Sequence, residues 1–168
     1  MIEVIISGGQ TGADRAALDA AIKLNIPHGG WCPKGRLAEL GGTIPEKYLL
    51  KETPSSDYSE RTKLNIRDSD GTLIFVPQMP LKVNDGTILT IQEVKDKNKP
   101  YIIIDLSHKP DCHLIAEWVK INNIKVLNIA GPRESQSPGI YQVCLHYLVE
   151  ILPVLQVNPN NSQSFSRL

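Results

Sequence analysis

Short runs of apolar residues alternate along this chain with longer segments in which apolar residues recur every three or four positions. The short runs predict strands at residues 2–6, 26–29, 72–76, 101–106 and 125–130. The longer segments predict helices at residues 14–24, 56–68, 87–95, 111–121 and 140–152, the last one ended by Pro153. Because the strand runs show little alternation of apolar and polar residues, they predict a mainly parallel α/β sheet of about five strands, with helices on both faces.

Two stretches depart from this alternation. Residues 37–53 form a long irregular segment, in which we expect only a short extended piece at residues 48–51. From residue 157 the composition turns polar, which is typical of a loose tail that is either disordered or docked on a neighbouring subunit. The 168 residues fit one domain, and we divide the chain into a ligand-binding domain at residues 1–152 and a polar C-terminal tail at residues 153–168.

The charge balance argues against functions that need a strongly charged surface. The chain has 18 basic and 18 acidic residues, so we expect binding neither to nucleic acid nor to an anionic membrane. No apolar run approaches the roughly 18 residues of a membrane span, and residues 1–4 do not resemble a signal peptide. No two of the three cysteines are spaced as a CxxC pair, so the sequence indicates neither a disulfide framework nor a zinc ribbon. These features predict a soluble, cytoplasmic protein.

Candidate chemistry gathers in the segments that follow the predicted strands. In an open α/β sheet these segments meet beyond the carboxyl ends of the strands, where ligands bind. Four of the five segments contain glycine, and basic residues lie among them: residues 8–12, 30–36, 77–87, 107–109 and 131–139. We therefore expect an anionic ligand to be held at this edge by local groups.

The first of these segments is a glycine turn that consists of Gly8, Gly9, Gln10, Thr11 and Gly12. Its glycines let the backbone approach a phosphate closely, and the helix that follows offers N–H groups and a positive dipole end. We predict Thr11 as the N-cap of that helix, with Asp14 placed as in a capping box, and an anion at the turn. The spacing matches neither GxGxxG nor the Walker motif, so a plain tight turn is the alternative.

A second candidate is the loop that contains Lys34, Gly35 and Arg36. Arginine can bind a phosphate through two hydrogen bonds and lysine adds a point charge, so this loop is expected to contribute to binding rather than to folding. A solvated loop with ordinary surface charges is the alternative. Cys32 precedes these cations, and we interpret it as a buried, inert thiol.

Further candidates come from the later helices and strands. Arg61, Asn65 and Asp68 share one stripe of a predicted helix, which faces either the crevice or solvent. Gly86 and Thr87 begin another helix, where the phosphate argument applies again. The last predicted strand leads into Arg133, which can reach the same edge.

Signals for a metal site or a nucleophilic site are weak. Asp68 and Asp70 alone are a poor indication of Mg²⁺, and Cys112 and His113 with His108 fit a surface loop better than a metal site. Neither GxSxG nor HExxH occurs. We predict no bound metal ion.

Taken together, these segments resemble the family of molybdenum carriers, or molybdenum-cofactor carriers. This family is similar in turn to the Rossmann-like superfamily that includes the lysine-decarboxylase-like phosphoribohydrolases. The resemblance covers residues 2–152 and rests on residues 7–15, 30–36, 61–62 with 65, 68–74, 86–87 and 130–133. It implies a single Rossmann-like, doubly wound domain, a phosphate-bearing ligand, the molybdenum cofactor as cargo, and a homo-oligomer. It also adds Arg15 and Asp70 to the candidate binding residues.

Two functions remain open. The first is a binding protein for a phosphate-bearing, nucleotide-like or pterin-like ligand. Its candidate binding residues are Gly8, Gly9, Gln10, Thr11, Gly12, Asp14, Arg15, Lys34, Gly35, Arg36, Arg61, Asn65, Asp70, Gly86, Thr87 and Arg133. The second is an enzyme that hydrolyses nucleotide N-glycosidic bonds.

One sequence feature separates the two functions. The phosphoribohydrolases carry catalytic glutamate in the helical turn after a Gly-Thr pair, and Leu89 and Thr90 stand at that place here, which favours the binding protein. An enzyme would need another carboxylate near the sugar. The candidates are Asp14, Glu52, Asp68, Asp70 and Glu134, of which Asp70 and Glu134 are our choices for a catalytic role.

Overall fold

A five-stranded parallel sheet forms the centre of the computed structural model, which describes residues 1–81 and 86–157. Its strands are β1 (Val4–Ile6), β2 (His28–Gly29), β5 (Gly71–Val76), β6 (Tyr101–Asp105) and β7 (Val126–Ala130). They lie in the order β2-β1-β7-β5-β6, and every neighbouring pair is parallel. The predicted parallel sheet of five strands is confirmed, and each strand begins or ends within a few residues of its predicted bounds.

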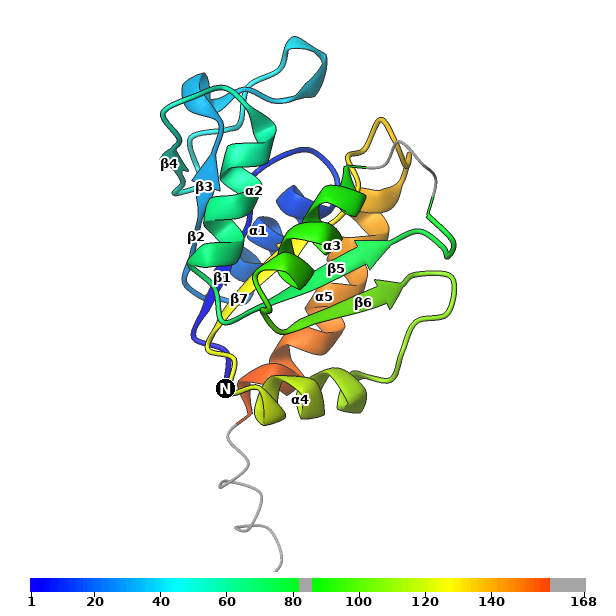
Figure 1. Cartoon of the computed structure of the whole chain (residues 1–168). Coiled ribbons are helices and arrows are strands. Elements are labelled where there is room, and N and C mark those ends of the chain that lie inside the picture. Colours follow the sequence, from blue (N-terminus) through cyan, green and yellow to red (C-terminus); the bar gives the residue numbers. More distant parts are fainter. Residues whose placement is uncertain (82–85, 158–168) are drawn as a thin grey trace, which may run out of the picture.

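Helices cover both faces of this sheet (Figure 1). The helices are α1 (Ala13–Lys23), α2 (Tyr58–Arg67), α3 (Thr87–Asp96), α4 (Cys112–Ile121) and α5 (Ile140–Gln156). On one face α5 packs against both α1 and α4, and on the other α2 packs against α3. The doubly wound architecture predicted from the sequence is therefore confirmed.

The strand order places a switch point at the centre of the sheet. Counted along the chain, the five strands stand in the order 2-1-5-3-4. Counted from β7 and continuing through β1, β2, β5 and β6, they stand in the order 3-2-1-4-5, which is the order of a Rossmann sheet. The segment after β7 leads to α5 on one face, whereas the segment after β5 leads to α3 on the other. A crevice is expected between the carboxyl ends of these two strands.

Strand β5 shows how the two hydrophobic layers form. All six of its residues are buried, and alternate side chains point to opposite faces of the sheet. Leu73 and Phe75 join the cluster of α1, α4 and α5, while Ile74 and Val76 join the cluster of α2 and α3. Burying one such side chain contributes about 1.5–3 kcal/mol. The uninterrupted apolar sequence of β5 thus stabilises both layers.

Residues 30–53, which we call the insertion, contain a second small sheet. Strands β3 (Trp31–Cys32) and β4 (Lys51–Glu52) pair in parallel, and two short 3₁₀ turns lie between them. Sequence analysis did not predict β3, because a two-residue strand is too short to show a period, and it placed the extended piece slightly too early. A separate cluster of Leu18, Cys32, Ala38, Ile44 and Tyr48 anchors the insertion on α1.

Helix α5 continues beyond the predicted end at residue 152. Pro153 lies inside it, although proline removes one backbone donor, and the helix ends only at Gln156. Leu152 and Leu155 are both buried in the main cluster, and this burial favours one more turn. Residues 158–168, most of the predicted polar tail, lie outside the described residues. Across the described chain, no helix is both long and apolar enough to cross a membrane.

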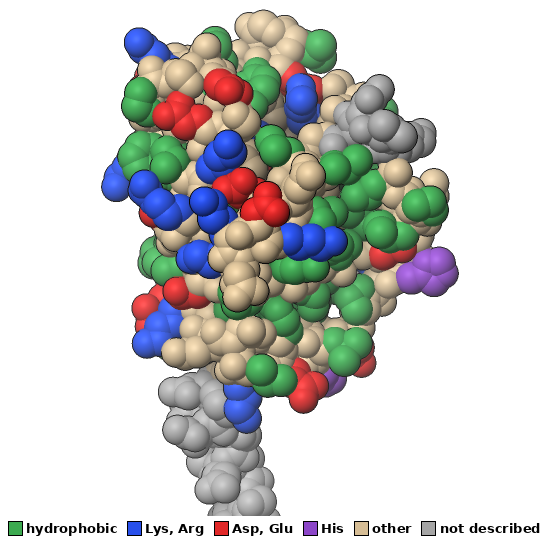
Figure 2. All heavy atoms as spheres, in the orientation of Figure 1, with side chains coloured by type: hydrophobic (Ala, Val, Ile, Leu, Met, Phe, Trp, Pro, Cys, Tyr) green, Lys and Arg blue, Asp and Glu red, His purple; other side chains and the backbone are tan. Residues whose placement is uncertain are grey.

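Acidic and basic side chains intermingle on the face shown in Figure 2, which agrees with the equal numbers of the two in the sequence. A ligand that is anionic must therefore be recognised by charges arranged locally rather than by a general field.

Candidate functional site

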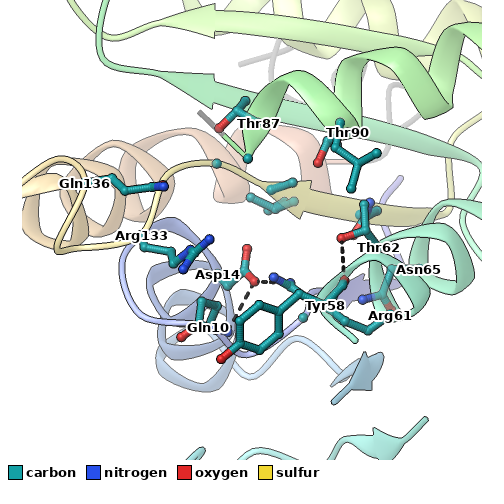
Figure 3. Close-up of a pocket in the computed structure, with 17 residues that line it drawn as sticks. Gln10, Asp14, Tyr58, Arg61, Thr62, Asn65, Thr87, Thr90, Arg133 and Gln136 are labelled. Carbon is teal, nitrogen blue, oxygen red and sulfur yellow. Dashed lines mark hydrogen bonds and ion pairs between the residues drawn. The ribbon is translucent and has the colours of Figure 1, made fainter. Parts of the chain in front are cut away.

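A pocket opens at the predicted edge of the sheet, where the strand order reverses. It is bounded by the segment after β1, the end of β7, the start of α3 and one side of α2 (Figure 3). Eight of the predicted binding residues line it: Gly8, Gln10, Asp14, Arg61, Asn65, Gly86, Thr87 and Arg133. The topological switch point and the predicted residues therefore coincide.

An ion pair between Arg61 and Asp14 forms one wall of the pocket. Nη1 of Arg61 donates to Oδ2 of Asp14 at 2.6 Å, and both side chains are largely buried. The same carboxylate oxygen accepts the backbone N–H of Gln10 at 3.2 Å. The Arg61 guanidinium lies directly on Gly8, because a Cβ there would stand 1.7 Å from Nη1. Glycine at position 8 therefore makes room for a side chain rather than for a phosphate.

Arg133 brings a second guanidinium to the pocket from the segment after β7. It lies over the ring of Tyr58, 5.5 Å from the ring centroid, which is a favourable cation–π arrangement. None of the ion pairs within the described residues includes Arg133. Because Asp14 offsets Arg61, the charge of Arg133 is left to attract a ligand anion.

The start of α3 faces this cation across the pocket (Figure 3). Gly86 is its N-cap residue and has no side chain with which to cap the helix, and a Cβ at that position would meet none of the described residues within 4 Å. The first N–H groups of a helix have no partner within it, and the helix dipole favours an anion at this end. Thr90 and Leu89 line the pocket a turn further on, where the sequence lacks the glutamate.

Gln10 contributes a buried donor. Its Oε1 accepts the backbone N–H groups of Thr11 at 3.2 Å and Glu39 at 2.9 Å, which fixes the orientation of the amide. Its Nε2 is buried and has no hydrogen-bond partner among the described residues, and the same holds for Nε of Arg61. An unpaired buried donor costs about 1–3 kcal/mol, so acceptor atoms of a ligand would stabilise this wall.

The glycine turn before α1 differs from the prediction. Gly12, not Thr11, is the N-cap residue, and the hydroxyl of Thr11 donates to Glu39 instead. The N–H of Ala13 donates to the carbonyl of Pro132 at 3.1 Å, and a Cβ on Gly12 would lie 2.3 Å from that oxygen. The amides of Gln10 and Thr11 also have protein acceptors. An anion at this turn would have to displace protein hydrogen bonds, because the segment after β7 packs on the start of α1.

The remaining predicted binding residues do not line the pocket. Arg36 donates to the backbone carbonyls of Ile44, Pro45 and Tyr48, at 3.0, 2.6 and 2.9 Å, so it holds the insertion together. Lys34 and Gly35 lie beside it in the same exposed turn.

Arg15 likewise donates to backbone carbonyls, those of Gly9 and Thr43. The predicted binding residues that do not line the pocket are therefore Gly9, Thr11, Gly12, Arg15, Lys34, Gly35, Arg36 and Asp70.

The carboxylates considered for catalysis have structural partners. Asp70 precedes β5, at the opposite edge of the sheet from the pocket, and accepts the N–H groups of Lys125 and Val126. Glu134 accepts the N–H groups of Gly139 and Tyr141 at the start of α5.

Asp68 and Glu52 are equally committed to partners. Asp68 accepts the indole N–H of Trp31 at 2.8 Å, and Glu52 accepts the N–H of Gly35 at 2.6 Å. Asp14 is therefore the one carboxylate that lines the pocket among the described residues.

The thiol and metal candidates lie away from the pocket. Cys32 is buried, and burial raises the pKa of its thiol despite the nearby guanidinium groups, as expected of an inert cysteine. The ligand atoms of Asp111, Cys112 and His113 lie within 4.8 Å of one another on an exposed helix start, without His108.

Sequence analysis missed several residues that line the pocket: Tyr58, Thr62, Asn128 and Gln136. Asn128 left a signal, since it is a polar residue inside an apolar strand and is buried beside Thr72, to whose hydroxyl its amide donates at 3.2 Å. Tyr58 left none, because an aromatic residue at a helix start has many structural explanations.

The fold and the pocket together define a Rossmann-like domain with a polar pocket at its switch point. The chain belongs to the circularly permutated YpsA SLOG family, which matches residues 5–152. The strand order, which becomes that of a Rossmann sheet when counted from β7, fits the permutation in this name. No curated protein matches the chain.

The chain is also similar to a solved structure. This is the crystal structure of the putative molybdenum carrier protein from Syntrophus aciditrophicus SB, which is 50% identical in sequence and superposes with a TM-score of 0.80. The match covers 93% of this chain and 96% of the other.

Proposed function

We propose that this protein binds a phosphate-bearing, nucleotide-like or pterin-like ligand and acts as a molybdenum carrier, with the molybdenum cofactor as its cargo. The observation that supports this most is Arg133, a cation without an ion-pair partner among the described residues, placed in a pocket opposite the start of α3. The name of the related structure, a putative molybdenum carrier protein, supports the carrier role.

The charges of the pocket favour a ligand anion. Asp14 and Arg61 neutralise each other at 2.6 Å, so Arg133 gives the lining one excess positive charge. The start of α3 adds the positive end of a helix dipole. A phosphate between these two elements would accept charge-assisted hydrogen bonds from Arg133 and backbone hydrogen bonds from α3.

The pocket also offers groups that suit the ring system of such a ligand. Tyr58 offers an aromatic surface, while Gln10 offers an unpaired amide donor that suits a ring nitrogen or carbonyl oxygen. Both nucleotides and pterin phosphates combine a phosphate with a flat ring that carries such acceptors.

The same lining favours binding over hydrolysis. Glycosidic cleavage develops positive charge at the sugar, and a carboxylate must stabilise it or position the water. Asp14, which alone of the described lining residues carries a carboxylate, already holds Arg61 and the backbone of Gln10. A carboxylate with these two partners is poorly suited to act on a ligand.

The test combines identification of the cargo with a charge substitution. Native mass spectrometry of the purified protein should show a copurified phosphate-bearing small molecule, and calorimetry should show binding of nucleoside monophosphates or pterin phosphates. Arg133→Met keeps an unbranched stem and removes the charged guanidinium, so affinity should fall about 10- to 100-fold. Lys63→Met is the matched control, since Lys63 is exposed on α2 and does not line the pocket. Equal affinity of Arg133→Met and wild type would refute the proposal.

A further inference from the structure

Glu39 connects three segments that are far apart in the sequence. It belongs to the insertion, and its carboxylate accepts the hydroxyl of Thr11, from the turn before α1. The same carboxylate accepts both the backbone N–H and the hydroxyl of Ser135, in the segment after β7. The hydroxyl of Thr11 in turn accepts the N–H of Glu134 at 3.2 Å.

These contacts hold the segment that carries Arg133. Glu134 and Ser135 are the two residues that follow Arg133, and both depend on Glu39, one directly and one through Thr11. Arg133 has no ion pair of its own within the described residues, so the geometry of this segment decides where its guanidinium lies.

Glu39 also fixes the other donor of the pocket. Its backbone N–H donates to Oε1 of Gln10 at 2.9 Å, and the N–H of Thr11 donates to the same oxygen. With its oxygen held in this way, the amide of Gln10 keeps Nε2 unpaired at the pocket wall. One residue of the insertion thus orients donors on two sides of the site.

The carboxylate of Glu39 is ionised at neutral pH. Burial opposes ionisation, but the hydrogen bonds from Ser135 and Thr11 and the charge of Arg133 outweigh it and hold the pKa below the ordinary value. A charged acceptor makes stronger hydrogen bonds than a neutral one, so the charge itself contributes to the hold on the segment.

We infer that Glu39 is a positioning residue of the pocket: it holds the Arg133 segment and the Gln10 amide in the arrangement that receives a ligand anion. The inference rests on the proposed function, since it concerns the same pocket. It gives the insertion a role at the site, although the insertion does not itself line the pocket.

A ligand-free experiment tests the hold on the segment. In Glu39→Gln, which keeps the size of the side chain and removes its charge, amide hydrogen exchange at Glu134 and Ser135 should be about tenfold faster than in wild type. Glu46→Gln is the control, because Glu46 is exposed on the same insertion and loses the same charge. If Glu39→Gln unfolds, Ser135→Ala removes one of the same hydrogen bonds at an exposed position. Exchange equal to wild type in the folded variants would overturn the inference.

A binding experiment tests the consequence for the ligand. With inorganic phosphate as the probe, Glu39→Gln should lower affinity about tenfold, as expected for coupled neighbours, whereas the Glu39→Gln/Arg133→Met double variant should bind no worse than Arg133→Met alone. Additive losses would overturn the inference, because they would show that Glu39 does not act through Arg133. Absence of phosphate binding by the wild-type protein would refute the proposed function, and the exchange experiment would still decide whether Glu39 holds the segment.

Discussion

Replacing Gly8 by alanine should disrupt the pocket through a single methyl group. The new Cβ would lie 1.7 Å from Nη1, 2.7 Å from Cζ and 2.8 Å from Cδ of Arg61, so the guanidinium has to move. Gly8 is not among the glycines with positive φ, so the alanine backbone itself is not strained. The perturbation therefore acts only through Arg61 and its ion pair with Asp14.

The expected loss of stability follows from the burial of that pair. The Arg61 and Asp14 side chains are 15% and 5% exposed, and they are joined at 2.6 Å. Breaking a buried pair by removing one partner costs about 3–5 kcal/mol. Asp14 keeps its hydrogen bond from the N–H of Gln10, and the displaced arginine regains water, so we expect a loss of about 2–4 kcal/mol. For a chain of this size, this lowers Tm by roughly 4–16 °C.

Urea unfolding of Gly8→Ala and of two comparison variants measures this loss. Gly86→Ala places its methyl group where none of the described residues lies within 4 Å, so it should change the free energy of unfolding by less than about 1 kcal/mol. Arg61→Ala removes the clashing side chain, so adding Gly8→Ala to it should cost almost nothing more. A Gly8→Ala protein as stable as wild type, or a double variant much weaker than Arg61→Ala, would refute the steric argument.

Two further predictions concern the insertion. Arg36→Met should destabilise the fold by about 1.5–3 kcal/mol in urea unfolding, because three backbone carbonyls lose a charged donor. Lys34→Met should have little effect. Unchanged stability of Arg36→Met would show that these hydrogen bonds are dispensable. Burial lowers the pKa of His28 from 6.5, and its Nε2 accepts the N–H of Leu49 as a neutral ring. As the pH falls, the His28 ring therefore takes up a proton more readily in the unfolded chain than in the folded one. The contribution of His28 to the free energy of unfolding is thus present above pH 6.5 and decreases below it. Between pH 7.5 and pH 5, urea unfolding should show a larger loss of stability in wild type than in His28→Gln. Equal losses in the two proteins would contradict this prediction.

The architecture could be predicted from the sequence because its strands are strongly apolar. The run at residues 71–76 is buried on both faces, and such a run is typical of a central parallel strand. The edge at which the candidate residues meet follows from the parallel sheet alone, and Gly86, Thr87 and Arg133 do line the pocket there. The strand order could not be predicted, since apolar runs carry no information about their neighbours in the sheet.

The sequence is ambiguous where one residue type serves two purposes. Glycine permits close approach of any neighbour, and the sequence does not say whether that neighbour is a phosphate or protein. At Gly8 the neighbour is Arg61, and at Gly12 it is the backbone of Pro132. Arginine is equally ambiguous, since Arg36 donates to carbonyls of its own insertion whereas Arg133 makes no ion pair among the described residues.

The strand order explains why the glycine turn before α1 is filled with protein. In a Rossmann sheet the phosphate lies after the first strand of the 3-2-1-4-5 order, and in this chain that strand is β7 rather than β1. The segment after β7 carries Arg133, and its backbone packs on Gly12 and accepts the N–H of Ala13. The turn after β1 thus supports the segment after β7, and Arg133 follows the strand that is counted first in the 3-2-1-4-5 order but comes last in the chain.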